Sequence, residues 1–136
     1  MSAEETVASY LSQTGKRFRS IGARMWMIRD EQELGDLIVT LNEPVVLFQV
    51  KLFDVPASCD RLRLYEELLR LNAEDMVHGA YGLQGGAVVA MDTLQAENLD
   101  FNEFQATVDA LGLSIATHMP HLGALAGLRA PAGGSS

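Results

Sequence analysis

The sequence predicts a single α+β domain with the element order α–β–β–β–α–β–β–α, in which helices pack on one face of a five-stranded antiparallel sheet. Segments that alternate with the period of strands fall into two groups, 23–55 and 77–94, with short turns inside each group. Helical apolar periodicity occurs before, between and after these groups. The 136 residues suit one hydrophobic core, so we expect one domain over 1–128 and a disordered tail over 129–136.

The first helix is predicted close to the start of the chain. Ser2 followed by Glu5 is a capping box, in which each side chain bonds the backbone of the other residue. Apolar residues from Val7 to Leu11 then recur at helical spacing, and Gly15 is placed where a helix ends in a left-handed residue.

Three strands are expected next, over 23–29, 36–42 and 44–55. Each alternates between two faces, and the third is the richest in β-branched and aromatic residues. Its pattern is continuously apolar on one face and mixed on the other, which suits a central strand. Pro56 cannot donate to a strand ladder and ends it.

A second helix is predicted over 61–72, capped by Ser58 or Asp60. Its buried row is Leu64, Leu68 and Leu71, with Tyr65 and Leu69 beside it.

Two short strands, 77–83 and 87–94, follow this helix and are joined through Gln84-Gly85-Gly86, a hairpin signal. Gly79 and Gly82 in the first of them indicate either a close approach of the backbone to a neighbouring segment or a local twist of the strand.

The last helix has the clearest start in the chain. Asp100 and Glu103 form a second capping box, and Leu99 with Phe104 is spaced as a hydrophobic staple. The apolar stripe of this helix is Phe104, Val108, Leu111 and Ile115. Because Pro120 lacks an N–H, we expect it to kink or end the helix near 116–117, with 121–128 as a candidate for one more turn.

The net charge of −8 is unevenly distributed. Five basic residues and no acids lie between Lys16 and Arg29, whereas 16 acids and four bases lie between Asp30 and Asp109. A chain this acidic is repelled by nucleic-acid phosphate, and the predicted hairpin has no Lys or Arg, so we expect no nucleic-acid partner. The basic segment is interpreted as a solvated strand face or as a contact for an acidic partner.

The sequence predicts a cytoplasmic protein that does not cross a membrane. No apolar run approaches about 18 residues, and the segment "MSAEETVASYL" lacks the basic and apolar regions of a secretory signal. Cys59 is the only cysteine and cannot form an internal disulfide, which fits a reducing compartment.

Residues suited to catalysis or metal binding are few and scattered. His118 and His121 can share a helical face, but no further ligands accompany them, so we expect a solvated pair and no metal or other cofactor. Cys59 lies near a helix start, has no histidine nearby in the sequence, and is interpreted as a buried or incidental thiol. We therefore predict no enzyme; a buried cluster of His78, Cys59 and an acid would reverse that prediction.

Apolar side chains exceed what one helix-covered sheet face needs. Those expected on the open side are Trp26, Ile28, Ile38, Val45, Leu47, Phe53, Val88 and Ala90. A contiguous apolar patch on a soluble protein usually marks an interface. The alternative is that helices cover these residues, since a register error of one residue exchanges the two faces.

The candidate partner contacts are Met25, Trp26, Met27 and Phe53, because methionine and aromatic side chains are adaptable anchors at interfaces. In a regular strand Met25 and Met27 point away from Trp26, so these three cannot serve one surface. For either set, the alternative is a place in the core.

Three stretches resemble the YbjN-domain family: "VKLFDVP", the helix end "LLRLN" and the "ENLDFNEF" lead into the last helix. That family is similar in fold to the type III secretion chaperones of the CesT type. The resemblance extends over about 23–122 and implies a five-stranded antiparallel α+β domain, commonly a homodimer. The residues it transfers are structural, not catalytic: Leu68, Leu69, Leu71, Asn72, Leu99, Asp100 and Phe104.

The leading hypothesis is a non-enzymatic chaperone-like or regulatory adaptor that dimerises and binds a protein or peptide partner through apolar surface. YbjN-domain proteins are described as sensory-transduction regulators, and the secretion chaperones hold an unfolded segment of an effector against their surface. The alternative hypothesis is a small-molecule-binding sensory regulator with a pocket between the sheet and the helices. A ligand-dependent rise in melting temperature without a protein partner would favour that alternative.

Overall fold

The computed structural model describes residues 1–29, 35–76 and 78–128. The elements are α1 (Ala3–Gln13), β1 (Phe18–Gly22), β2 (Met25–Ile28), β3 (Leu37–Asn42), β4 (Val45–Asp54), α2 (Arg61–Glu74), β5 (Ala80–Gln84), β6 (Ala87–Gln95) and α3 (Phe101–Ala126). The predicted α+β class is confirmed. The predicted tail at 129–136 lies outside the described residues, and the domain limits stay a prediction.

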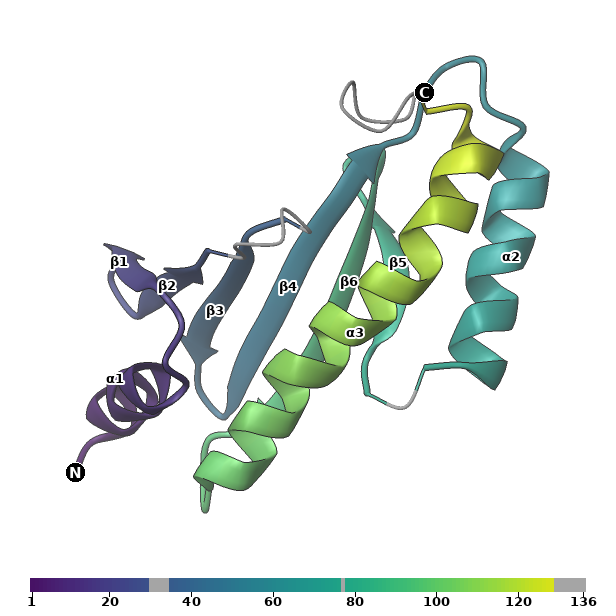
Figure 1. The fold of residues 1–136 in the computed structure, drawn as a ribbon. Coiled ribbons are helices and arrows are strands. Elements are labelled where there is room, and N and C mark those ends of the chain that lie inside the picture. The colour runs from purple at the N-terminus through teal and green to yellow at the C-terminus, as the bar shows by residue number, and fades with distance from the viewer. Residues whose placement is uncertain (30–34, 77, 129–136) are drawn as a thin grey trace.

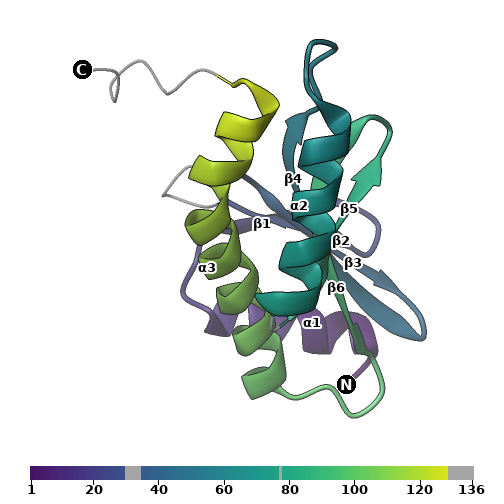
Figure 2. The same ribbon diagram turned by 90° about the vertical axis from the view of Figure 1, so that its right-hand side faces the viewer.

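The described strands form one antiparallel sheet of six strands in the order β1-β2-β3-β4-β6-β5. In Figure 1, α3 lies across β4 and β6, α2 lies beside α3 at the β5 edge, and α1 lies at the end occupied by β1 to β3. Contacts of α3 with β4 and β6, of α2 with β5, and of α1 with β3 agree with this arrangement. Figure 2 shows the layer of α2 and α3 from the side.

In the described part of the chain the sheet has one strand more than the five predicted. β1 pairs with β2 through a tight turn at Ala23 and Arg24, where Arg24 has a φ of 58°. The register of β1 shifts between Ser20 and Gly22, which marks an irregularity of the β-bulge kind. Because a bulge interrupts the period-two alternation by which strands are recognised in a sequence, the sequence pattern does not predict β1.

The predicted caps are present where the structure describes them. Ser2 accepts a hydrogen bond from the N–H of Glu5, whose carboxylate in turn accepts from the backbone N–H of Ser2. Asp60, rather than Ser58, caps α2. Asp100 caps α3 by accepting from the N–H of Glu103, which is one of the two bonds of the capping box predicted there.

The predictions for Gly79 and Gly82 have different outcomes. A Cβ at Gly79, which has a φ of 76°, would lie 2.3 Å from the carbonyl oxygen of Met91, so the predicted close backbone approach is confirmed there. At Gly82 a Cβ would meet nothing within 4 Å, so no close approach explains that glycine.

Two predictions about the helices are wrong. The predicted end of the last helix near 116–117 is wrong, because α3 continues through Pro120 to Ala126. Ala116 and Pro120 are both exposed, so water can bond the carbonyl that the proline leaves without a donor. Leu69 was placed beside the buried row of α2, yet 69% of it is exposed.

The core lies between the sheet and the helices. Phe48 of β4 and Phe104 of α3 are fully buried and meet edge to face, with ring centroids 5.2 Å apart. The hydroxyl of Tyr10 donates to the carbonyl of Leu99 at 3.0 Å, which ties α1 to the segment before α3. Helices therefore cover one face of the sheet, and the other face is left without helices in the described part of the chain.

Candidate functional site

The strand register decides which side chains face the helices. Trp26 pairs with Val39, which is fully buried, and Ala90 pairs with buried Val50. Five residues expected on the open side are buried on the covered side instead: Trp26, Ile28, Phe53, Val88 and Ala90. The face assignment is wrong for these five, whereas Ile38, Val45 and Leu47 do lie on the uncovered side, opposite in alternation to the buried residues of β3 and β4.

Phe53 changes sides for an identifiable reason. In β4 the buried residues before Lys51 are Val46, Phe48 and Val50, so regular alternation would expose Phe53 together with Leu47. The pairing of β4 with β6 shifts register between Lys51 and Phe53, and this shift returns Phe53 to the covered side, where it is 8% exposed.

The candidate partner contacts are therefore divided by the sheet. Trp26 and Phe53 belong to the hydrophobic core, whereas Met25 and Met27 are half-buried on the uncovered side. We define the open sheet face as Met25, Met27, Ile38, Thr40, Leu47, Gln49 and Met91. None of the helices in the described part of the chain lies over this face (Figures 1 and 2).

The open sheet face has an ordered row across four strands. Met27 pairs with Ile38, Ile38 with Gln49, and Gln49 with Met91. A hollow of about 440 Å³ lies on this face; its lining includes Met27, Ile38 and Val89, and charged residues border it. Gln49 donates a hydrogen bond to Gln84, so part of the polar lining of the hollow is already hydrogen-bonded within the protein.

A second exposed apolar surface lies on the outside of α2. Leu62 and Leu69 are seven residues apart, share one helical face, and are each 69% exposed. We call this pair the α2 outer stripe. Arg70 lies beside it and forms ion pairs with Glu67 and Glu74, so the apolar pair has a charged border.

The edge of β5 is closed near its start by a side chain. The amide of Asn72 donates to the carbonyl of Tyr81 at 3.0 Å, and its oxygen accepts from the N–H of Tyr81 at 2.7 Å. The side chain thus bonds the strand edge as a neighbouring strand would, and it blocks addition of another strand there. The sequence marked Asn72 only as a helix end, whereas α2 continues to Glu74.

A buried polar cluster joins α2, β5 and α3. The Tyr81 hydroxyl lies 2.7 Å from Nδ1 of His118, and Nε2 of His118 lies 3.3 Å from Oδ2 of Asp75. His118 is only 7% exposed, so the predicted solvated histidine pair is wrong for this residue. His121 is exposed and lies 2.7 Å from the carboxylate of Glu67.

The electrostatics of this cluster indicate a structural role. Burial, with a contribution from the charge of Asp75, raises the pKa of Tyr81 to about 12, so its hydroxyl stays a neutral donor near pH 7. The hydrogen bond from Arg70 lowers the pKa of Glu67, which keeps that carboxylate charged beside His121. The contacts of His118 with Asp75 and of His121 with Glu67 hold α3 against α2.

The cysteine and histidine that an enzyme hypothesis required do not form a cluster. The thiol of half-buried Cys59 lies 3.9 Å from the carbonyl of Leu125, while His78 lies 3.9 Å from Asp92. Within the ranges that the structure describes, no group of three or more histidine, cysteine, aspartate or glutamate residues could hold a metal ion. A membrane-spanning segment is also absent among the described helices, none of which combines enough length with enough hydropathy.

The alternative hypothesis required a pocket between the sheet and the helices. A cavity of about 470 Å³ does lie between the covered side of β2 to β4 and α3. Binding of a small molecule there stays a prediction.

The family model CesT_Tir_1 matches residues 1–127, nearly the whole described chain. The chain belongs to the CesT_Tir_1 family. This is a type III chaperone family, so the resemblance noted in the sequence is confirmed. The match includes α1 and β1, which lie outside the stretch of about 23–122 over which the resemblance was seen.

Solved structures with the same fold agree with membership in the CesT_Tir_1 family. A chain of the heterodimeric ExoU-SpcU complex of the Pseudomonas aeruginosa type III secretion system is 21% identical, with a TM-score of 0.66 over 82% of this chain and 93% of that chain. YbjN from E. coli is 16% identical, with a TM-score of 0.65 over 86% and 91% of the two chains. A chain of the HopA1-SchA chaperone–effector complex is 10% identical, with a TM-score of 0.60 over 80% and 86%. Among curated proteins, none matches this chain.

Proposed function

We propose that this CesT_Tir_1 protein is a non-enzymatic chaperone-like protein of the cytoplasm. In this proposal it dimerises and holds a segment of a partner polypeptide against the open sheet face. The observation that carries the proposal is a sheet face over which no described helix packs and on which the row Met27, Ile38, Gln49 and Met91 is apolar except for Gln49.

The open sheet face has the chemistry of a site for a polypeptide segment. Its three methionines, Met25, Met27 and Met91, have flexible side chains that can adapt to different apolar partners. Thr40 and Gln49 stand among them, so backbone groups of a bound segment would find hydrogen-bonding partners. Burial of apolar area would supply the affinity, at roughly 25 cal/mol per Å² before the costs of association are subtracted.

The dimer contact is assigned to the α2 outer stripe. A twofold dimer brings the same patch of both copies together, and two antiparallel α2 helices would place Leu62 of one copy near Leu69 of the other. This contact leaves the open sheet face accessible, because α2 lies on the covered side of the sheet.

The comparisons support the protein-binding part of this proposal. The family is a type III chaperone family, and one similar structure is described as a chaperone–effector complex. A protein partner and a non-catalytic role are the functions these relatives suggest.

Two charge substitutions test the two surfaces separately. Leu69→Glu should give a monomer by size-exclusion chromatography with light scattering, whereas Met27→Glu should remain a dimer. In affinity capture from lysate of the source cells, wild-type protein should retain a partner that Met27→Glu does not retain. Identical sets of captured proteins for the wild type and Met27→Glu would contradict the assignment of the open sheet face.

A further inference from the structure

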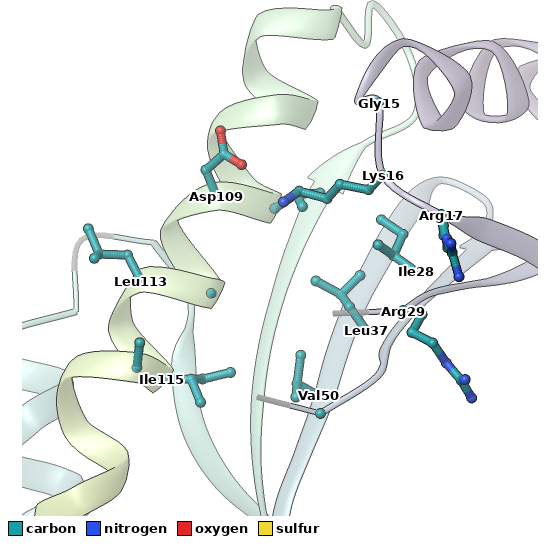
Figure 3. Close-up of a pocket in the computed structure, with 14 residues that line it drawn as sticks. Gly15, Lys16, Arg17, Ile28, Arg29, Leu37, Val50, Asp109, Leu113 and Ile115 are labelled. Carbon is teal, nitrogen blue, oxygen red and sulfur yellow. The ribbon is translucent and has the colours of Figure 1, made fainter. Parts of the chain in front are cut away.

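The cavity between the sheet and α3 has an apolar floor and lies on the helix-covered side, away from the open sheet face. Ile28, Leu37 and Val50 from three neighbouring strands and Ile115 from α3 line it. Figure 3 shows these side chains converging on the space between the strands and the helix. Its volume of about 470 Å³ is within the range of pockets that bind small molecules.

A glycine in the middle of α3 keeps one wall of the cavity open. Gly112 lines the cavity, and a Cβ built at this position would meet nothing within 4 Å. Glycine destabilises a helix interior relative to alanine, and neither backbone conformation nor close packing requires it here. Its observable consequence is unfilled space beside the apolar floor.

The mouth of the cavity is basic in a protein that carries a net charge of −8. Lys16 reaches across the mouth toward α3 (Figure 3), and Arg17 and Arg29 also line the cavity. Among the lining residues that the structure describes, Asp109 is the acidic one. Within the ranges that the structure describes, neither Lys16 nor Arg29 forms an ion pair.

We propose that this cavity binds an amphipathic anion of the medium-chain alkyl carboxylate class. The alkyl chain lies on Ile28, Leu37, Val50 and Ile115, and the carboxylate pairs with Lys16 at the mouth. The apolar floor supplies most of the affinity, while the basic mouth selects an anion over a neutral or cationic molecule with the same chain. This site is separate from the open sheet face and does not rest on the proposed polypeptide binding.

The test uses decanoate as the probe, with decyltrimethylammonium as a cation of equal chain length, in isothermal titration calorimetry on the full chain. Decanoate should bind the wild type and bind more tightly than the cation. Gly112→Leu fills the cavity and should abolish decanoate binding. Gly112→Ala likewise removes the helix-destabilising glycine but adds only a methyl group, so it should retain decanoate binding.

The charge at the mouth is tested with a matched pair of variants. Lys16→Glu should weaken decanoate binding several-fold, whereas Arg19→Glu, in the same basic segment but outside the cavity lining, should leave it within about twofold of the wild type. Thermal unfolding verifies that each variant is folded.

Three results would overturn this assignment: no binding of decanoate to the wild type, equal affinity for the cation, or unchanged affinity in Gly112→Leu. Met27→Glu should bind decanoate normally, so failure of the polypeptide site and failure of the cavity site are distinguishable.

Discussion

The two faces of the sheet are built from alternate residues of the same strands, yet they differ in what covers them. In β4, Phe48 is fully buried against α3, while its neighbour Leu47 is only half-buried on the open sheet face. Both faces are rich in apolar side chains. The difference comes from the three helices, all of which pack on the same side.

Because of this difference, side chains of the two faces should differ in what their removal costs. A side chain on the covered face is surrounded by close-packed neighbours, so its removal leaves a cavity. A side chain on the open sheet face has solvent on one side, so its removal costs little and its surface stays available to another molecule. A change on the open sheet face should therefore cost little stability, whereas a change on the covered face weakens the whole fold.

The largest expected effect is a direct contrast between neighbouring residues. Phe48→Ala should lower the free energy of unfolding by about 3–5 kcal/mol because it removes a fully buried ring that packs on Phe104. Leu47→Ala should lower it by about 1 kcal/mol or less. Urea denaturation measures both values, and similar losses for the two variants would refute the distinction between the faces.

The join between α2 and the sheet should show the next largest effect. Asn72→Ala removes both hydrogen bonds to Tyr81 and leaves the edge of β5 unpaired, at a cost of about 1–3 kcal/mol. Asn102→Ala, an exposed position in the first turn of α3, is the matched control and should change stability little. If chemical denaturation gives equal values for both variants, the Asn72 contact contributes nothing.

The buried cluster at Tyr81 predicts a dependence of stability on alkaline pH. The pKa of Tyr81 is raised from 10.0 to about 12 in the folded protein. Below pH 10 both states hold the proton; between about pH 10 and 12 the unfolded state loses it first, so stability falls as pH rises, by up to about 1.4 kcal/mol per unit. Tyr81→Phe should lack this component, and denaturation curves that change in parallel for both proteins would contradict it.

The smallest expected effect is a gain on the covered side. Thr107 is fully buried, and its hydroxyl has no hydrogen-bond partner among the residues described. Thr107→Val replaces that hydroxyl by a methyl group of similar shape and should raise the free energy of unfolding by about 1 kcal/mol. Thr117→Val is the control, because the hydroxyl of Thr117 bonds the carbonyl of Leu113 at 2.8 Å and gains nothing from removal. A lower melting temperature for Thr107→Val would show that the hydroxyl has a bonding role.

Features encoded by neighbouring residues could be predicted from the sequence. The capping pair of Ser2 and Glu5, the cap at Asp100, and the turn through Gly85 and Gly86 all depend on interactions within a few residues. The fold class followed from the order of these elements. The family resemblance also rested on such local patterns, and the family match confirms it.

Features that depend on distant residues could not be predicted in this way. Because of its bulge, β1 does not show the alternation of a strand in the sequence. The register shift after Lys51 places Phe53 in the core. His118 is buried because Tyr81 and Asp75 of other elements reach it. The face of the sheet that remains open depends on which side the helices pack, and in a strand a shift of one residue reverses that outcome without changing the hydrophobic pattern.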